Sequence, residues 1–293
     1  MSFELLTPTI FFQTAVSGLL LGGVYALIAL GLTLIFGVMR VINVAHGTFL
    51  MVGAYITYWL FHLYGVNPIL SLIISMPLLF VFGLVLHRFV IAKVVDAPEL
   101  TSLLVTFGIS IFIINVVIYF FSSDFRAVPY LTGSVKLQGV AFSMPRSVAF
   151  GVALAISILS YLFLKKTRLG KAIRAVSQHR DVAQICGIDI GRIDMVAFGL
   201  GLALAAAGGS LISFLFVIFP EMGNNYLLKC FAVVILGGIG SYTGAFLGGL
   251  LIGVSEAFGA LLISAQAAEA VAYIILVMVL LLKPSGLVGG VWE

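Results

Sequence analysis

The stretch KKTRLGKAIRAVSQHRDVAQICGIDIGRID (165–194) is the only long polar run in this chain. On both sides of it the sequence is almost continuously apolar: 62% of the residues are hydrophobic, 9% are charged, and the mean hydropathy is +1.25. Soluble domains carry roughly a quarter charged residues. Apolar runs of about 20 residues, the length of a helix that crosses a bilayer, recur from end to end. The sequence therefore predicts a polytopic membrane protein that holds one polar segment in water.

The apolar runs predict an all-α fold with eight or nine transmembrane segments in a single membrane domain, 1–293, because no stretch is long enough for a soluble domain. The first segment is longer than a straight crossing needs, which predicts a tilt or a break. The seventh is short and runs into GGIGS, which predicts a half-helix or re-entrant piece. The predicted segments are 9–37, 44–63, 67–86, 101–121, 146–164, 193–219, 226–240, 243–262 and 265–282.

The basic residues predict the orientation of the chain, since Lys and Arg accumulate in cytoplasmic loops. Seven of the 15 Lys and Arg residues lie in 165–192, so we expect this segment on the cytoplasmic side. Arg40 and the loop 88–99 then lie on the same side, while 122–145 and the N-terminus lie outside. Three basic residues oppose this scheme more weakly: Arg126, Lys136 and Arg146.

Small residues recur every four positions along several predicted segments. Such columns let helix backbones approach closely in lipid, where burying Leu against Leu gives no hydrophobic gain. We predict that most of them serve packing. The columns are Gly18, Gly22, Ala26; Gly199, Ala203, Ala207; Gly201, Ala205, Gly209; Gly240, Gly244, Gly248; and Ser241, Ala245, Gly249, Gly253.

The polar segment contains signals for two short helices joined by a turn. Leu169, Ile173 and Val176 recur at the spacing of one helix face, which predicts an amphipathic helix. Asp181 is expected to cap a second helix, with Gln184 at the capping-box position. Gly187 then supplies a left-handed C-cap, and Ile188 the hydrophobic contact that follows it. This rigid unit suits three roles: lying on anionic lipid, forming an ordinary structured loop, or docking a cytoplasmic partner that exerts force.

The segment resembles the coupling loop of ABC-importer permeases, an Ala-rich short helix followed by Gly and an aliphatic residue. DVAQICGIDI keeps Ala183, Gly187 and Ile188 in that relation, although the Glu-Ala-Ala triplet of the loop is absent. Further stretches are similar to the LivH-type permeases of branched-chain amino acid ABC importers, over essentially the whole chain and in the family's order. They are GLTLIFGVMRVINVAHGTFLMVGAY (31–55), PELTSLLVTFGIS (98–110), TRLGKAIRAV (167–176) and AVVILGGIGSYTGAFLGGLLIGVSEA (232–257).

The resemblance implies a permease subunit in the inner membrane of a bacterium or archaeon. Its partners would be two cytoplasmic ATPase subunits, a homologous second permease or a copy of itself, and an extracytoplasmic substrate-binding protein. Nucleic acid is not an expected partner. The cargo would be a branched-chain or related hydrophobic amino acid, or another small polar solute. The residues expected to couple ATPase movement to the membrane domain are Arg168, Gly170, Arg174, Asp181, Ala183, Gly187 and Ile188.

The chain is expected to be non-catalytic and to hold no cofactor or metal. It contains no G-x-x-x-x-G-K-[ST] phosphate loop, so ATP would be bound by partner subunits. Its four histidines are spread over predicted segments and loops without metal-ligand spacing, and Cys186 and Cys230 form neither a disulfide framework nor a metal motif.

Polar groups inside the predicted segments are the candidates for a translocation path or gate. Glu256 lies near the middle of segment 243–262, where an ionisable group is costly; it either meets solute or pairs with a polar group of a neighbouring helix. Asn43, His46 and Gly47 either form a polar break between helices or an ordinary helix cap. Two glycines in the GGIGSYTG turn (237–244) either pack closely or flex during gating: Gly238 and Gly240.

Two other classes of protein stay open. A self-sufficient secondary transporter or channel would also use discontinuous helices and a buried Glu, but it needs several convergent polar groups as an ion site. A membrane enzyme that acts on lipid is less favoured, because no Ser/His/Asp or paired-acid arrangement is present.

Overall fold

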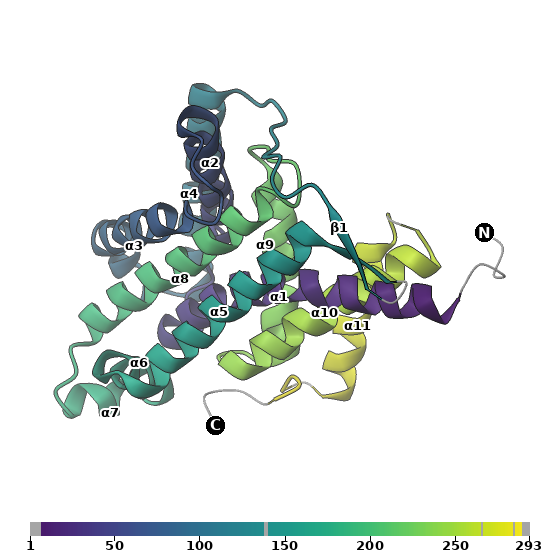
Figure 1. The fold of residues 1–293 in the computed structure, drawn as a ribbon. Coiled ribbons are helices and arrows are strands. Elements are labelled where there is room, and N and C mark those ends of the chain that lie inside the picture. Colours follow the sequence, from purple (N-terminus) through teal and green to yellow (C-terminus); the bar gives the residue numbers. More distant parts are fainter. Residues whose placement is uncertain (1–6, 138–139, 265, 284, 289–293) are drawn as a thin grey trace.

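A computed structural model describes residues 7–137, 140–264, 266–283 and 285–288. In the described part of the chain, helices dominate and one short hairpin interrupts them (Figure 1). The elements are α1 (Pro8–Met39), α2 (His46–Tyr64), α3 (Leu72–Phe89), η2 (Ile91–Lys93), α4 (Glu99–Phe121), β1 (Ser134–Leu137), β2 (Val140–Ser143), α5 (Met144–Lys166), α6 (Arg168–Gln178), α7 (Arg180–Ile185), α8 (Ile190–Ile212), α9 (Met222–Gly237), α10 (Tyr242–Leu262) and α11 (Ala268–Leu282).

Helices α1 and α8 form the centre of the molecule. Residues 22–35 of α1 and 201–212 of α8 are buried without interruption. The two helices pack against each other, α10 packs along α1, and α2 and α3 pack on α8. Figure 1 shows α1 and α10 side by side, with α6 and α7 at one end of α5 and α8. A displacement of α1 or α8 therefore reaches most of the helical core.

The small-residue columns lie at the closest helix contacts, as predicted. A Cβ atom at Gly22 would lie 2.8 Å from the carbonyl oxygen of Gly249, and one at Gly249 would lie 2.5 Å from the Cα of Ala26. A Cβ atom at Gly53 in α2 would lie 2.5 Å from the carbonyl oxygen of Ala206 in α8. Small residues thus set the spacing of α1 with α10 and of α2 with α8.

The predicted apolar segments all contain helices, and six of the described helices are long and apolar enough to cross a membrane. These six are Pro8–Met39, Leu72–Lys93, Glu99–Phe121, Met144–Lys166, Ile190–Ile212 and Tyr242–Leu262. Two further apolar helices are shorter than these six: Met222–Gly237 and Ala268–Leu282. The short seventh segment is thus a short helix, α9, that ends at the GGIGS turn as the sequence predicts.

One predicted boundary was wrong. Helix α8 ends at Ile212 rather than near residue 219, and its chain continues through turns to Ile218, which pairs with Arg126. Helix α1 is continuous over 32 residues, so a break is excluded, and a tilt of this long helix stays a prediction. The fold is predominantly helical as predicted, and β1 and β2 add an antiparallel hairpin with Ser134 opposite Ser143.

Arg126, which opposed the predicted orientation, is anchored by specific contacts. Its backbone bonds Ile218 in both directions, and its guanidinium carbon lies 5.2 Å and 5.1 Å from the ring centres of Tyr58 and Trp59 at the end of α2. A cation held over aromatic rings is stabilised locally. These contacts explain the position of Arg126 without requiring that its side of the membrane be cytoplasmic.

Candidate functional site

The first helix of the polar segment, α6, folds back tightly on the end of α5. The Thr167 side chain caps it by accepting a hydrogen bond from the Gly170 N–H at 3.0 Å. A Cβ atom at Gly170 would lie 2.5 Å from the Cα of Leu164, so the site has no room for a larger residue. Ile173 and Val176 are buried as the periodicity predicts, whereas Leu169, the first residue of the predicted face, is 39% exposed. Helix α6 is therefore a packed part of the membrane domain.

Helix α7 ends as the sequence predicts. The Gly187 backbone is left-handed with φ of 84°, its N–H bonds the carbonyl oxygen of Gln184, and the Ile188 N–H bonds that of Ala183 at 3.1 Å. This pair of bonds is the Schellman motif, and Ile188 packs against the core. Val182 and Ile185 remain 57% and 86% exposed on the outer face of the turn. The segment thus presents an apolar surface on a rigid base.

The expected cap at the start of α7 was wrong. The N-cap position is His179 in extended conformation, and the Asp181 side chain makes no cap hydrogen bond because it already lies in the first helical turn. Its carboxylate still lies at the positive end of that turn. Of the other expected coupling residues, Ala183 is buried, Arg168 is in the first turn of α6, and Arg174 donates to the Lys165 carbonyl oxygen at 3.4 Å.

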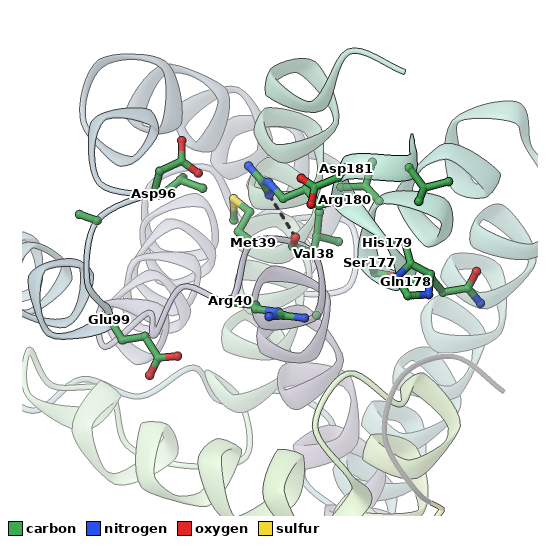
Figure 2. A pocket seen from close by; sticks show the side chains of 15 residues that line it. Val38, Met39, Arg40, Asp96, Glu99, Ser177, Gln178, His179, Arg180 and Asp181 are labelled. Carbon is green, nitrogen blue, oxygen red and sulfur yellow. Dashed lines mark hydrogen bonds between the residues drawn. The ribbon is translucent and has the colours of Figure 1, made fainter. Parts of the chain in front are cut away.

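A residue outside the expected set ties the polar segment to the core. Arg180 forms a two-pronged ion pair with Asp194 of α8, with Nη2–Oδ2 at 2.6 Å and Nη1–Oδ1 at 3.1 Å. Its Nη1 also donates to the carbonyl oxygen of Val38 in the last turn of α1 at 3.3 Å (Figure 2). Opposite charges 14 residues apart in sequence were the only available signal, and that spacing alone does not predict contact.

A cavity of about 490 Å³ lies beside this contact. Figure 2 shows Asp96 and Glu99 on one side of it and Arg180, Asp181 and His179 on the other. The end of α1, the connection from η2 to α4, and the α6–α7 turn therefore meet on one face of the molecule. The predicted orientation also places these three connections on a common side.

Asn43, His46 and Gly47 meet at the centre of the molecule. His46 is fully buried, and its Nε2 donates to the Ile28 carbonyl oxygen at 3.0 Å, in the middle of α1. Asn43 is fully buried, and neither atom of its side-chain amide has a hydrogen-bond partner among the described residues. A Cβ atom at Gly47 would lie 3.0 Å from the Cβ of Leu227 and closer still to the backbone of Gly223 in α9.

The helix-cap alternative for Asn43 was therefore wrong, since the N-cap of α2 is Ala45 and its side chain makes no cap bond. Polar groups of α4 complete this cluster. Thr106 accepts from the Val44 N–H and donates to the Ile42 carbonyl oxygen, and Ser110 shares a 2.6 Å hydrogen bond with Thr48. A buried amide with unmet hydrogen-bonding groups is costly in an apolar interior. The connection between α1 and α2 is a polar break, as the alternative interpretation predicted.

Glu256 pairs with a neighbouring helix, through a lysine that the sequence reasoning missed. Lys229 Nζ of α9 lies 2.7 Å from Glu256 Oε1 of α10 and 3.1 Å from Glu269 Oε1 of α11. It also lies 5.2 Å and 5.9 Å from the ring centres of Tyr25 and Tyr226. Lys229 is the only Lys, Arg, Asp or Glu residue in segment 226–240, and this isolated charge was the available signal.

The GGIGSYTG turn connects α9 to α10 through several hydrogen bonds. Gly238 and Gly240 have φ of 100° and 82°, conformations that favour glycine. Ser241 caps α10 by accepting from the Gly244 N–H at 3.1 Å. The Leu287 N–H bonds the Leu236 carbonyl oxygen at 2.9 Å, which fastens a later segment to this turn. The turn is thus held by local contacts, and its flexing during gating stays a prediction.

The fold and these sites define a helical membrane protein whose polar segment is fixed to its two central helices. The family model described as the permease component of branched-chain amino acid transport systems matches residues 14–282, so the chain belongs to this permease family. No solved structure matches the chain.

Curated relatives cover nearly the whole chain. The high-affinity branched-chain amino acid transport system permease protein BraD of Pseudomonas aeruginosa is 34% identical over 95% of this chain and 96% of its own length. LivH of Escherichia coli, a permease protein of the same kind of system, is 30% identical with the same coverage. The probable branched-chain amino acid transport permease LivH of Methanocaldococcus jannaschii is 30% identical over 91% of this chain and 89% of its own length.

Proposed function

We propose that this chain is the membrane-spanning permease subunit of an ATP-driven importer of branched-chain or related hydrophobic amino acids. Membership of the permease family supports the class of function, and the names of the relatives support the cargo. The subunit itself performs no covalent chemistry and binds no ATP. It works in the inner membrane with two cytoplasmic ATPase subunits, a second permease and an extracytoplasmic substrate-binding protein.

The observation that carries the proposal is the form of segment 165–194. A surface loop that only joined two helices would not need a capped helix, a Schellman turn and an ion pair to the core. Its exposed Val182 and Ile185 give a partner an apolar contact, while the buried side holds the segment on α1 and α8. A docking surface that receives force needs both features.

The path for solute runs beside the polar connection between α1 and α2. The Asn43 amide there has no hydrogen-bond partner within the described part of the chain, and such a polar group can bind a passing zwitterion. Glu256, in contrast, holds α9, α10 and α11 together through Lys229 and acts on the path indirectly. In this proposal α2, α9 and α11 also cross the membrane with the six longer helices, which places the N-terminus outside and the α6–α7 segment inside.

Co-purification from the native membrane in mild detergent tests this function. Mass spectrometry is expected to find two ATP-binding subunits and a second permease with the chain. Uptake of leucine, isoleucine or valine by the reconstituted assembly should require ATP and the binding protein. Recovery of the chain alone, with solute transport after reconstitution of that single protein, would overturn the proposal.

One observation favours the second candidate, a self-sufficient secondary transporter. Lys229, Glu256 and Glu269 converge inside the helical bundle, and proton- or ion-coupled transporters use such clusters. Uptake by the chain alone, driven by an imposed ion gradient and abolished by Glu256→Gln, would select this function instead.

A further inference from the structure

Arg180 joins three parts of the molecule that are far apart in sequence. It starts α7 in the polar segment, pairs with Asp194 in the first turns of α8, and donates to Val38 in the last turn of α1. The Asp194 side chain is 4% exposed and the Arg180 side chain 31% exposed. The fork of a guanidinium fixes both the distance and the direction of its partners, which a single ammonium does not.

The surroundings of Arg180 leave it room to move with the polar segment. Arg180 lines the 490 Å³ cavity and also a second cavity of about 390 Å³, which reaches His87, Gln184 and Asp194. Close-packed interiors transmit a push only through groups in contact. Helix α6 also packs on α5, α8 and α1. To this packing the Arg180 guanidinium adds a direct polar connection from the α6–α7 turn to both central helices.

A neighbouring ion pair provides a built-in comparison. Arg192 pairs with Asp189 at 2.8 Å, and their side chains are 81% and 56% exposed. Both residues lie at the start of α8, where Asp189 is the N-cap. Among the described residues, the Arg192 side chain makes no hydrogen bond or ion pair to α1, α6 or α7. Exposed pairs of this kind contribute little to stability. Both arginines carry the same charge and pair with an aspartate, but Arg180 links α7 to α1 and α8, whereas Arg192 pairs with the N-cap of its own helix.

We propose that Arg180 is a positioning residue that carries displacement of the α6–α7 segment into α1 and α8. When the segment moves, the Asp194 carboxylate and the Val38 carbonyl move with it, and the packed core changes as a unit. The inference rests on the proposed function, because it needs a partner that moves the segment. In this proposal the ion pair determines how much solute the importer moves for each ATP hydrolysed.

The test measures that ratio in the complete importer reconstituted with binding protein. Arg180→Ala is expected to leave assembly and ATP hydrolysis at the natural level and to lower transport per ATP by about 10-fold, a typical size for coupling between sites. Arg192→Ala, the matched control, should leave the ratio unchanged. The exchange Arg180→Asp with Asp194→Arg should regain part of the loss, because it restores an ion pair at the same place.

Three results would overturn the inference. The first is an unchanged ratio in Arg180→Ala. The second is equal loss of transport and hydrolysis in Arg180→Ala and Asp194→Asn with no gain in the exchanged pair, which identifies a purely structural contact. The third is the same loss in Arg192→Ala. If the natural chain yields no complex with an ATPase, the proposed function fails first and the result is distinct from these.

Discussion

Replacing Lys229 by Met removes the ammonium group from its largely buried pair with Glu256 and leaves two carboxylates, Glu256 and Glu269. The unbranched Met side chain keeps most of the packing of the lysine stem. Lys229 and Glu256 are 10% and 17% exposed, and Glu256 Oε2 already lacks a hydrogen-bond partner among the described residues. Breaking a buried pair by removing one partner costs about 3–5 kcal/mol. We expect Lys229→Met to lower the free energy of unfolding by about this amount.

Two further variants separate this charge effect from a general loss of packing. Glu269 is 49% exposed, so Glu269→Gln should cost less than about 1 kcal/mol. Because Gln at position 256 removes the stranded charge, Lys229→Met with Glu256→Gln should be more stable than Lys229→Met alone by about 1–3 kcal/mol.

Equilibrium unfolding of the purified chain in mixed micelles with rising denaturing detergent, followed by circular dichroism, measures these differences. The reasoning is refuted if Lys229→Met stays within about 0.5 kcal/mol of the natural chain, the range of ordinary surface substitutions. It is equally refuted if the double variant loses as much free energy of unfolding as Lys229→Met and Glu256→Gln, each measured alone, lose together.

Gly47→Ala should destabilise the chain by about 1–3 kcal/mol, because the added Cβ would collide with the backbone of α9. Gly108→Ala is the control: its Cβ would meet no described atom within 4 Å, so it should be neutral or slightly stabilising in the same unfolding assay. Gly187→Ala should cost about 1–2 kcal/mol, since φ of 84° is strained for any residue with a Cβ, and protease cleavage near residue 187 should become faster; equal cleavage rates would contradict the Schellman assignment. Thr48→Val and Ser110→Ala should each cost about 1 kcal/mol by unfolding, and the double variant should cost clearly less than the sum, because both remove one shared hydrogen bond.

The helical framework could be predicted from the sequence because a bilayer demands long apolar helices whatever their neighbours are. The ends were harder to place. Helix α8 stops at Ile212 although apolar residues continue, because the chain there turns to pair with Arg126. The β1–β2 hairpin lies in a short connection of mixed polar and apolar residues, where hydropathy does not distinguish a strand from a loop.

The candidate site divides in the same way between local and long-range features. The Gly187 cap depends on five neighbouring residues, so the sequence predicts it correctly. The roles of Asn43 and Arg180 depend on which helices meet, and a single sequence does not contain that information. Lys229 was overlooked because it lies within an apolar run, although its isolation there was a usable signal.

The most direct test of the central claim uses the two cysteines that the chain already has. Cys186 is exposed at the end of α7 and Cys230 is buried, so a thiol-reactive photocrosslinker on the natural chain attaches at Cys186. In native membranes, light is expected to join the chain to an ATP-binding subunit, with a yield that changes when ATP is added, and Cys186→Ser should abolish the product. Crosslinks to lipid alone, in membranes that import the amino acid actively, would contradict the account.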